Sequence, residues 1–161
     1  MLEIVSTKHK RDCLRCDHNV KILTDFKINV SFIVMNDSNL KKILVVDDEQ
    51  ETLAHLTSIL KRAQYQVISS TTGKEAIELA IDTKPDLLIL DIFIPDMRGW
   101  EIRHKLLENE ATAQIPVIFL TGLNTQEDER IIRESGNYHL LAKPVTSESV
   151  LEAVRRVLTE L

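Results

Sequence analysis

Four short apolar runs constrain the fold of this sequence more than any other feature. They cover residues 43–46, 87–90, 117–120 and 140–142, and polar residues bound each of them. Segments with the apolar spacing of amphipathic helices lie between them. Uniformly apolar strands are typical of parallel sheets, because helices cover both faces of such a sheet. The pattern therefore predicts an α/β domain with a core of its own.

From residue 41 onward the sequence predicts five strand–helix units, the arrangement of a doubly wound sheet with helices on both faces and right-handed crossovers. The expected strands cover residues 42–47, 66–69, 86–91, 116–120 and 138–142. The expected helices cover residues 49–63, a segment opened by Thr72 and stopped by Pro85, and residues near 100–109, 126–135 and 147–160. The sequence ends after the last of these, so we expect any output domain on another chain.

Two local expectations refine the helices. Thr72 and Glu75 have the spacing of a capping box, in which both side chains bind backbone N–H groups at the start of the helix. The helix near 100–109 is expected to carry the apolar residues Ile102, Leu106 and Leu107.

Residues 1–40 do not fit the repeat, and we expect an N-terminal extension that is poorly defined or partly disordered. The turn-rich segment 36–39 is typical of a linker, whereas the alternation of apolar residues over 26–32 is strand-like. A further hypothesis is that Met35 is the natural start, which intact-mass measurement of the natively expressed protein would test. The domain proper is then residues 41–161.

Cys13 and Cys16, with His9 and His18 beside them, have the spacing of half a zinc site. The alternative is an incidental pair in a polar segment, and the sequence leaves both open. A disulfide framework is not indicated by two cysteines.

The charge balance limits the partners. Residues 41–161 hold 14 Lys and Arg against 20 Asp and Glu, a net charge of −6. An acidic domain without a basic stripe argues against direct contact with nucleic acid. The sequence has neither an apolar run long enough to span a membrane nor a secretion signal, so we expect a cytoplasmic protein without membrane insertion.

Polar residues follow four of the predicted strands. These are Asp47 with Asp48, then Asp91, then Thr121, and finally Lys143 before Pro144. Ligands bind at the carboxyl ends of parallel strands. If the ends meet, one cleft holds three carboxylates, a hydroxyl and an ammonium, which suits a divalent cation and a phosphoryl group.

Taken together, Asp47-Asp48, the segment Asp91–Gly99, Thr121-Gly122 and Lys143-Pro144 resemble the motifs of the receiver domain of two-component response regulators. The resemblance covers about residues 41–161. It implies a flavodoxin-like sheet of strand order 2-1-3-4-5, and a stand-alone signalling protein rather than an enzyme. Its output would be contact with an unknown downstream target protein.

The resemblance also implies the role of each site residue. Asp91 would be the phosphoacceptor and would take phosphate from a histidine kinase or a histidine phosphotransfer protein. Asp48, Asp91 and the backbone carbonyl of Phe93 would ligate Mg²⁺, with Asp47 acting mainly through a bound water. The remaining two residues, Lys143 and Thr121, would bind phosphoryl oxygens.

Two departures from the family pattern matter. The family usually has an aromatic residue three positions before the lysine, and this chain has Leu140 there. This chain therefore lacks the aromatic ring that reports activation in the family. Position 93, two after the phosphoacceptor, is a large apolar phenylalanine, from which we predict slow intrinsic loss of phosphate.

Three functions compete. The first is a stand-alone receiver, either an output effector or a phosphorelay intermediate. The second is a phosphatase acting through an aspartyl phosphate, but that mechanism needs a second acid where Phe93 stands. The third is a pseudo-receiver that acts as a phosphorylation-independent binding module, and the complete set of site residues counts against it.

Overall fold

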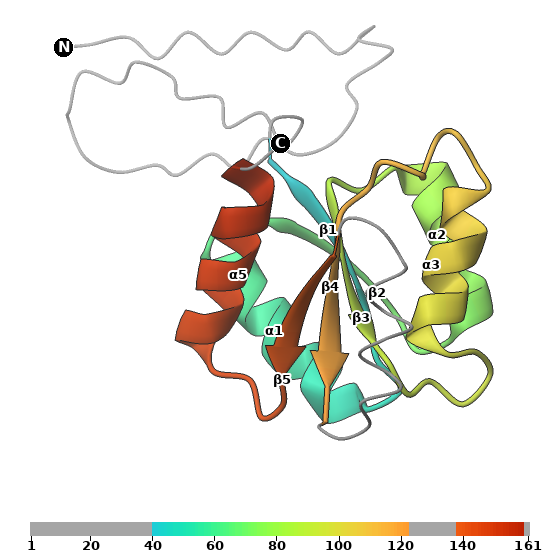
Figure 1. Cartoon of the computed structure of the whole chain (residues 1–161). Helices are drawn as coiled ribbons and strands as arrows, with labels where there is room; N and C mark the ends of the chain where they lie inside the picture. Colours follow the sequence, from blue (N-terminus) through green and yellow to red (C-terminus); the bar gives the residue numbers. More distant parts are fainter. Residues whose placement is uncertain (1–39, 123–137, 160–161) are drawn as a thin grey trace, which may run out of the picture. The chain divides into compact units, whose positions relative to one another are not determined.

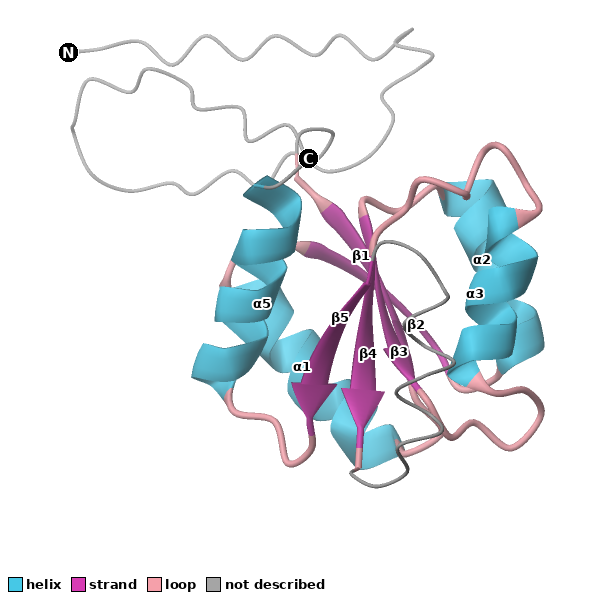
Figure 2. Cartoon of the chain, in the orientation of Figure 1, coloured by secondary structure: helices cyan, strands magenta, loops and turns pink. Residues whose placement is uncertain are grey.

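In the computed structural model, a five-stranded sheet lies between two layers of helices (Figure 1 and Figure 2). The structure describes residues 40–122 and 138–159. All strand pairs are parallel, and the order is β2-β1-β3-β4-β5. The strands are β1 (Lys42–Val46), β2 (Gln66–Ser70), β3 (Leu87–Asp91), β4 (Val117–Thr121) and β5 (Tyr138–Ala142). The predicted flavodoxin-like order is thus confirmed.

Helices α1 (Gln50–Arg62) and α5 (Ser147–Thr159) cover one face of the sheet, and α2 (Gly73–Thr83) and α3 (Gly99–Leu107) cover the other (Figure 1). Strand side chains alternate between the faces, so neighbours such as Ile89 and Leu90 belong to different cores. The α2–α3 core contains Leu44, Val46, Leu88, Leu90, Val117 and Phe119. The α1–α5 core contains Ile43, Val45, Leu87, Ile89, Ile118 and Leu120.

One local expectation, the capping box at Thr72 and Glu75, needs correction. Thr72 Oγ1 accepts the N–H of Glu75 at 3.3 Å, as a capping box requires, but the carboxylate of Glu75 does not return to Thr72. It accepts the hydroxyl of Ser70 at 2.7 Å instead, because Ser70 also accepts the N–H of Thr72 and so takes the place expected for the glutamate. The three apolar residues expected on the helix near 100–109 lie on α3: Ile102 and Leu106 are buried, and Leu107, the last residue of the helix, is 38% exposed.

At the amino ends of the strands, Asp86 fixes the start of β1. Its carboxylate accepts the backbone N–H of Lys42 at 2.8 Å and the ammonium of Lys41 at 2.7 Å. Burial raises the pKa of Asp86, but these bonds and charges outweigh it, so its pKa lies below the ordinary value.

The connection from α3 to β4 is held by two buried polar side chains. Arg103, 2% exposed, donates to the carbonyls of Ile115 at 3.0 Å and Ala113 at 3.1 Å. The hydroxyl of Thr112 donates to the carbonyl of Leu106 at 2.7 Å. Burial lowers the pKa of the Arg103 guanidinium. These bonds pair backbone carbonyls of the connection and of the end of α3, and so fix the path of the chain from α3 to β4.

Several expectations fall outside the described residues: the helix near 126–135, the N-terminal extension with its candidate start at Met35, and the Cys13 and Cys16 pair. They stay predictions. Across the described ranges, no helix combines the length and the apolar character needed to cross a bilayer.

Candidate functional site

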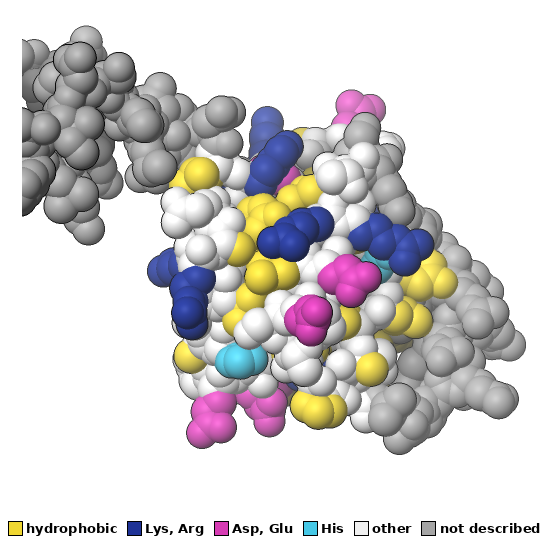
Figure 3. All heavy atoms as spheres, turned by 90° about the vertical axis from the view of Figure 1, so that its left-hand side faces the viewer, with side chains coloured by type: hydrophobic (Ala, Val, Ile, Leu, Met, Phe, Trp, Pro, Cys, Tyr) yellow, Lys and Arg dark blue, Asp and Glu magenta, His cyan; other side chains and the backbone are white. Residues whose placement is uncertain are grey.

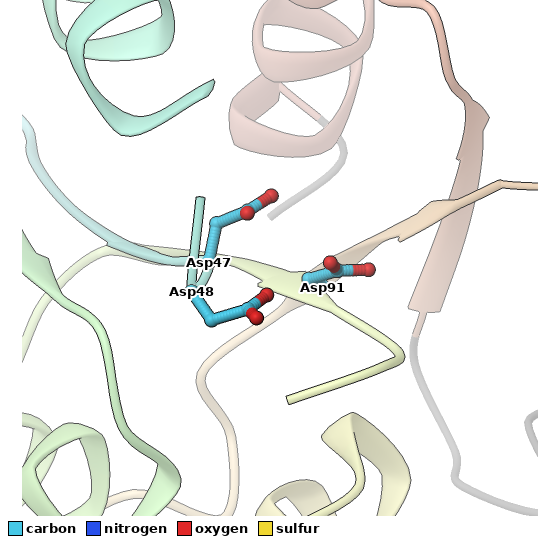
Figure 4. A group of neighbouring side chains, drawn as sticks. All are labelled: Asp47, Asp48 and Asp91. Atoms are coloured by element: carbon cyan, nitrogen blue, oxygen red, sulfur yellow. The ribbon is translucent and has the colours of Figure 1, made fainter. Parts of the chain in front are cut away.

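Three carboxylates meet where β1 and β3 end. Val46 and Leu90 are partners in the sheet, so the residues that follow them, Asp47 and Asp91, come side by side. Asp48 follows on the same loop, and the three carboxylates are turned toward a common space (Figure 4). One ligand oxygen from each lies within 4.8 Å of the others. The predicted acidic site is therefore formed.

Lys143 joins two of these carboxylates. Its Nζ donates to Asp47 Oδ2 at 2.7 Å and to Asp91 Oδ2 at 2.9 Å. The backbone N–H of Lys143 donates to the carbonyl of Thr121 at 2.7 Å, which places the residue beside the end of β4. The Lys143-Pro144 peptide bond is cis. Residues 96 positions apart in the chain are thus within one hydrogen-bond network.

The electrostatics of the site follow from two carboxylates sharing one ammonium. The side chain of Asp47 is fully buried, and burial raises its pKa even though Lys143 and the N–H of Glu49 oppose the shift. Burial lowers the pKa of Lys143, but its bonds to Asp47 and Asp91 outweigh this and raise it. The raised pKa keeps the ammonium charged, and it is one cation beside a cluster of three carboxyl groups, so the cluster has room for a further positive charge.

The connection from β3 to α3 brings backbone against the Asp91 side chain. Asp91 Oδ1 accepts the N–H of Phe93 at 3.3 Å. Phe93 and Arg98 form an isolated antiparallel bridge, and the Arg98 guanidinium lies 4.7 Å from the centre of the Phe93 ring, which is within cation–π range. Phe93 is 46% exposed.

Glycine is required at position 99, where the β3–α3 connection returns to the end of β3. Its N–H donates to the carbonyl of Ile92 at 3.0 Å, and a Cβ at this position would lie 2.4 Å from the carbonyl oxygen of Asp91. No side chain fits at that distance, so the closed connection depends on glycine.

The donor set fits a hard divalent cation. Mg²⁺ takes oxygen ligands, uses one or two carboxylates and keeps several waters. Asp47 and Asp91 are buried whereas Asp48 is exposed, so the cluster has a side open to water. Lys143 already offsets part of the charge. The cluster therefore suits one small dication that keeps several of its waters better than a cation that must be enclosed by protein ligands.

The structure brings together four of the predicted side chains: Asp47, Asp48, Asp91 and Lys143. Thr121 ends β4 beside Lys143 through its carbonyl, and the role of its hydroxyl stays a prediction. The carbonyl of Phe93 as a metal ligand likewise stays a prediction.

Sequence reasoning missed two contacts around the site. Asp96 binds the start of α2, and Arg98 packs on the Phe93 ring. Both residues lie in the segment already assigned to the site. No sequence signal identified their partners, because the Asp96 partner is 23 residues away and the Arg98 contact depends on the loop geometry.

Comparison with known proteins agrees with this geometry. Residues 43–155 match the model of the response regulator receiver domain. Protein PilH of Pseudomonas aeruginosa is 32% identical over 117 residues, covering 73% of this chain and 97% of PilH. The structure of chemotaxis response regulator CheY4 of Vibrio cholerae aligns with a TM-score of 0.70 at 27% identity, covering 73% of this chain and 98% of that one.

A probable cyclic di-GMP phosphodiesterase of Vibrio cholerae is 36% identical over 132 residues, covering 81% of this chain. The chain spans only 30% of that relative's length. PilH, by contrast, is matched over nearly its whole length, so a stand-alone receiver fits the relatives. The family serves in two-component signalling as phosphoacceptor domains and is generally not enzymatic. This chain belongs to the response regulator receiver family.

Proposed function

We propose that Asp91 is the residue of this receiver that accepts phosphate, from a phosphohistidine on a histidine kinase or a histidine phosphotransfer protein. The observation that carries the proposal is the bond from Lys143 Nζ to Asp91 Oδ2 within a cluster of three carboxylates. Charge neutralisation and positioning are what phosphoryl transfer mainly requires of a protein. Lys143 supplies both to Asp91, because its ammonium offsets negative charge and its hydrogen bond holds the carboxylate in place.

The proposed reaction breaks one bond and forms another. A carboxylate oxygen of Asp91 attacks the phosphorus, and the P–N bond to the donor histidine breaks with its electron pair returning to the imidazole. The ammonium of Lys143, already within hydrogen-bond reach of Asp91, is placed to donate to a phosphoryl oxygen. The hydroxyl of Thr121 would donate to another.

We assign Mg²⁺ to the three carboxylates. Asp48 and Asp91 would hold it directly with the carbonyl of Phe93, and Asp47 would act mainly through a water. When bound, the cation offsets the charge that builds on the phosphoryl oxygens. Without a cation, three clustered carboxylates repel an anionic phosphodonor, and that repulsion explains why the reaction should require the metal.

The proposed output is contact with a downstream protein. The aspartyl phosphate adds charge and acceptor oxygens, which would draw Thr121 and Lys143 inward and shift the balance between two existing states. Figure 3 shows the side on which α5 lies, where Lys and Arg side chains occur together with Asp and Glu among apolar ones. A surface of mixed sign favours a protein partner over direct contact with nucleic acid. The cytoplasmic location stays a prediction.

The competing functions are less well supported. A pseudo-receiver would not need Lys143 bound to two carboxylates, and the family comparison favours the phosphoacceptor. A phosphatase would need an acid at position 93, where the chain has Phe93. We therefore propose that chemistry at this site is confined to self-phosphorylation from small phosphodonors and hydrolysis of the chain's own phosphate.

Incubation of the full chain with acetyl phosphate and Mg²⁺, read by intact mass, tests the proposal. We expect one added phosphate in the wild type and in the control Asp82→Asn, whose side chain lies exposed on α2. Asp91→Asn should give none. An adduct that persists in Asp91→Asn would overturn the assignment. Absence of an adduct in the wild type, confirmed with a histidine kinase, would favour the pseudo-receiver.

A further inference from the structure

Asp96, which the roles assigned so far leave out, ties the β3–α3 connection to another part of the domain. Its Oδ1 accepts the N–H of Gly73 at 2.8 Å, and its Oδ2 accepts the N–H of Lys74 at 3.1 Å. Both donors belong to the first turn of α2, where backbone N–H groups otherwise lack partners and favour a negative charge. The bond from Gly73 is the main reason that the pKa of Asp96 lies below its ordinary value.

The same helix start is linked to the other acidic loop through Ser70, the last residue of β2. The carbonyl of Ser70 accepts the N–H of Asp47 at 3.3 Å, and the hydroxyl of Ser70 donates to Glu75 in the first turn of α2 at 2.7 Å. The first turn of α2 therefore has bonds on two sides. Ser70 connects it to Asp47, and Asp96 connects it to the segment that follows Asp91.

The segment between Asp91 and Asp96 is short and fixed at its base. Phe93 is paired with Arg98, and the N–H of Gly99 donates to the carbonyl of Ile92. The bonds of Asp96 fix the far end of the same segment. Removing them would leave the tip of the connection held only by its base and by the packing of Ile94 and Met97 against the α2–α3 core.

We propose that Asp96 is a positioning residue for divalent-cation binding, because it anchors the backbone of Phe93 and Asp91 to the helix start that also holds Asp47. The cation then meets ligands that are already spaced for it, and little binding energy is lost in ordering the loop. This inference rests on the proposed function, since it takes the three-carboxylate cluster as the cation site. Asp96 itself is not a ligand.

The test is the Kd for Mg²⁺ of the full chain, measured by calorimetry and by the fluorescence of Trp100. This residue is the single tryptophan of the sequence and lies directly after Gly99. We expect Asp96→Ala to raise the Kd about three- to tenfold, less than the roughly 10- to 100-fold loss typical of partners bonded directly to a metal ligand, because Asp96 acts through the backbone. Asp96→Asn should stay within about twofold, because an asparagine oxygen can still accept the N–H of Gly73. The control Asp82→Ala should bind as the wild type does.

A second readout separates positioning from loss of folding. In the wild type, Mg²⁺ should shift the NMR signals of the Gly73 and Lys74 amides, which belong to a helix start and not to the cation site. In folded Asp96→Ala those shifts should disappear. Wild-type affinity in Asp96→Ala would overturn the positioning role. If Asp48→Asn also bound Mg²⁺ as the wild type does, the cation site of the proposed function would fail instead.

Discussion

Replacing Gly99 with alanine should disturb the fold and the site together. The added Cβ would lie 2.4 Å from the carbonyl oxygen of Asp91 and 3.2 Å from the Cα of Ile92. Both neighbours are backbone atoms at the end of β3, and neither belongs to a flexible side chain that could turn away. Since contacts under 3.0 Å are not tolerated, β3 and α3 must separate by at least about 0.6 Å.

The size of the effect follows from that shift. Overpacking of this kind costs about 1–3 kcal/mol of the free energy of unfolding, partly offset by the better helix propensity of alanine. For a domain of this size the melting temperature should fall by about 3–15 °C. Because the displaced atoms include the backbone of Asp91, phosphorylation by acetyl phosphate should slow by about tenfold or more in molecules that remain folded.

Differential scanning calorimetry and the intact-mass assay measure the two effects. Gly122→Ala is the stability control, since a Cβ there meets no atom within 4 Å among the described residues. Gly73→Ala should fall between the two, because its Cβ would lie 2.9 Å from Cδ1 of Ile102, the end of a side chain that can turn, and 2.9 Å from Cβ of Met97, which moves only with its backbone. An unchanged melting temperature together with a wild-type phosphorylation rate in Gly99→Ala would refute the reasoning.

Three further predictions follow from the site and from the opposite end of the sheet. Lys143→Ala leaves Asp47 and Asp91 facing each other without an ammonium. In the presence of a chelator it should lower the free energy of unfolding by about 1–3 kcal/mol, and added Mg²⁺ should restore part of the loss. Equal melting temperatures of mutant and wild type in chelator would contradict this. Phe93→Asn should speed the loss of phosphate by admitting water, measured by intact mass over time against the control Leu107→Asn, and an unchanged decay rate would count against shielding by the ring. Asp86→Asn should cost about 0.5–1.5 kcal/mol at pH 7, in denaturant melts. The folded pKa of Asp86 lies below its ordinary value, so its contribution to the free energy of unfolding is present above about pH 4 and is lost as the pH falls through the folded pKa. The melts of mutant and wild type should therefore converge in acid. A difference that persists in acid would contradict the assignment.

Much of the fold could be predicted because the strands are short and because β1, β3 and β4 are almost uniformly apolar and buried. The run 138–142 was assigned with the bounds that β5 has, and the others differ from the structure by one residue at one or both ends. Buried strands leave little room for error, since a polar residue marks each boundary. Helix faces follow less directly from the sequence than strands do. Leu107 has the right spacing for burial, but its exposure depends on where α3 ends against its neighbours, and local sequence does not fix that.

The candidate site could be predicted as far as its residues follow strand ends. Asp47, Asp48, Asp91 and Lys143 all do, and parallel topology brings such positions to one edge of the sheet. The bonds of Asp96 could not be predicted in the same way. They join residues whose spacing follows no periodicity, and they depend on how far the β3–α3 connection extends toward α2.

The division of the interior into two cores has a consequence for how such a chain can change over time. Strand residues one apart contribute to different cores, so the helices on one side can exchange their packing residues while the other side keeps its own. The charged cluster belongs to neither core, because it lies at the strand ends beyond both. Each helical layer is therefore free to diverge separately, and a lineage could acquire a new partner on α1 and α5 without rebuilding the layer formed by α2 and α3.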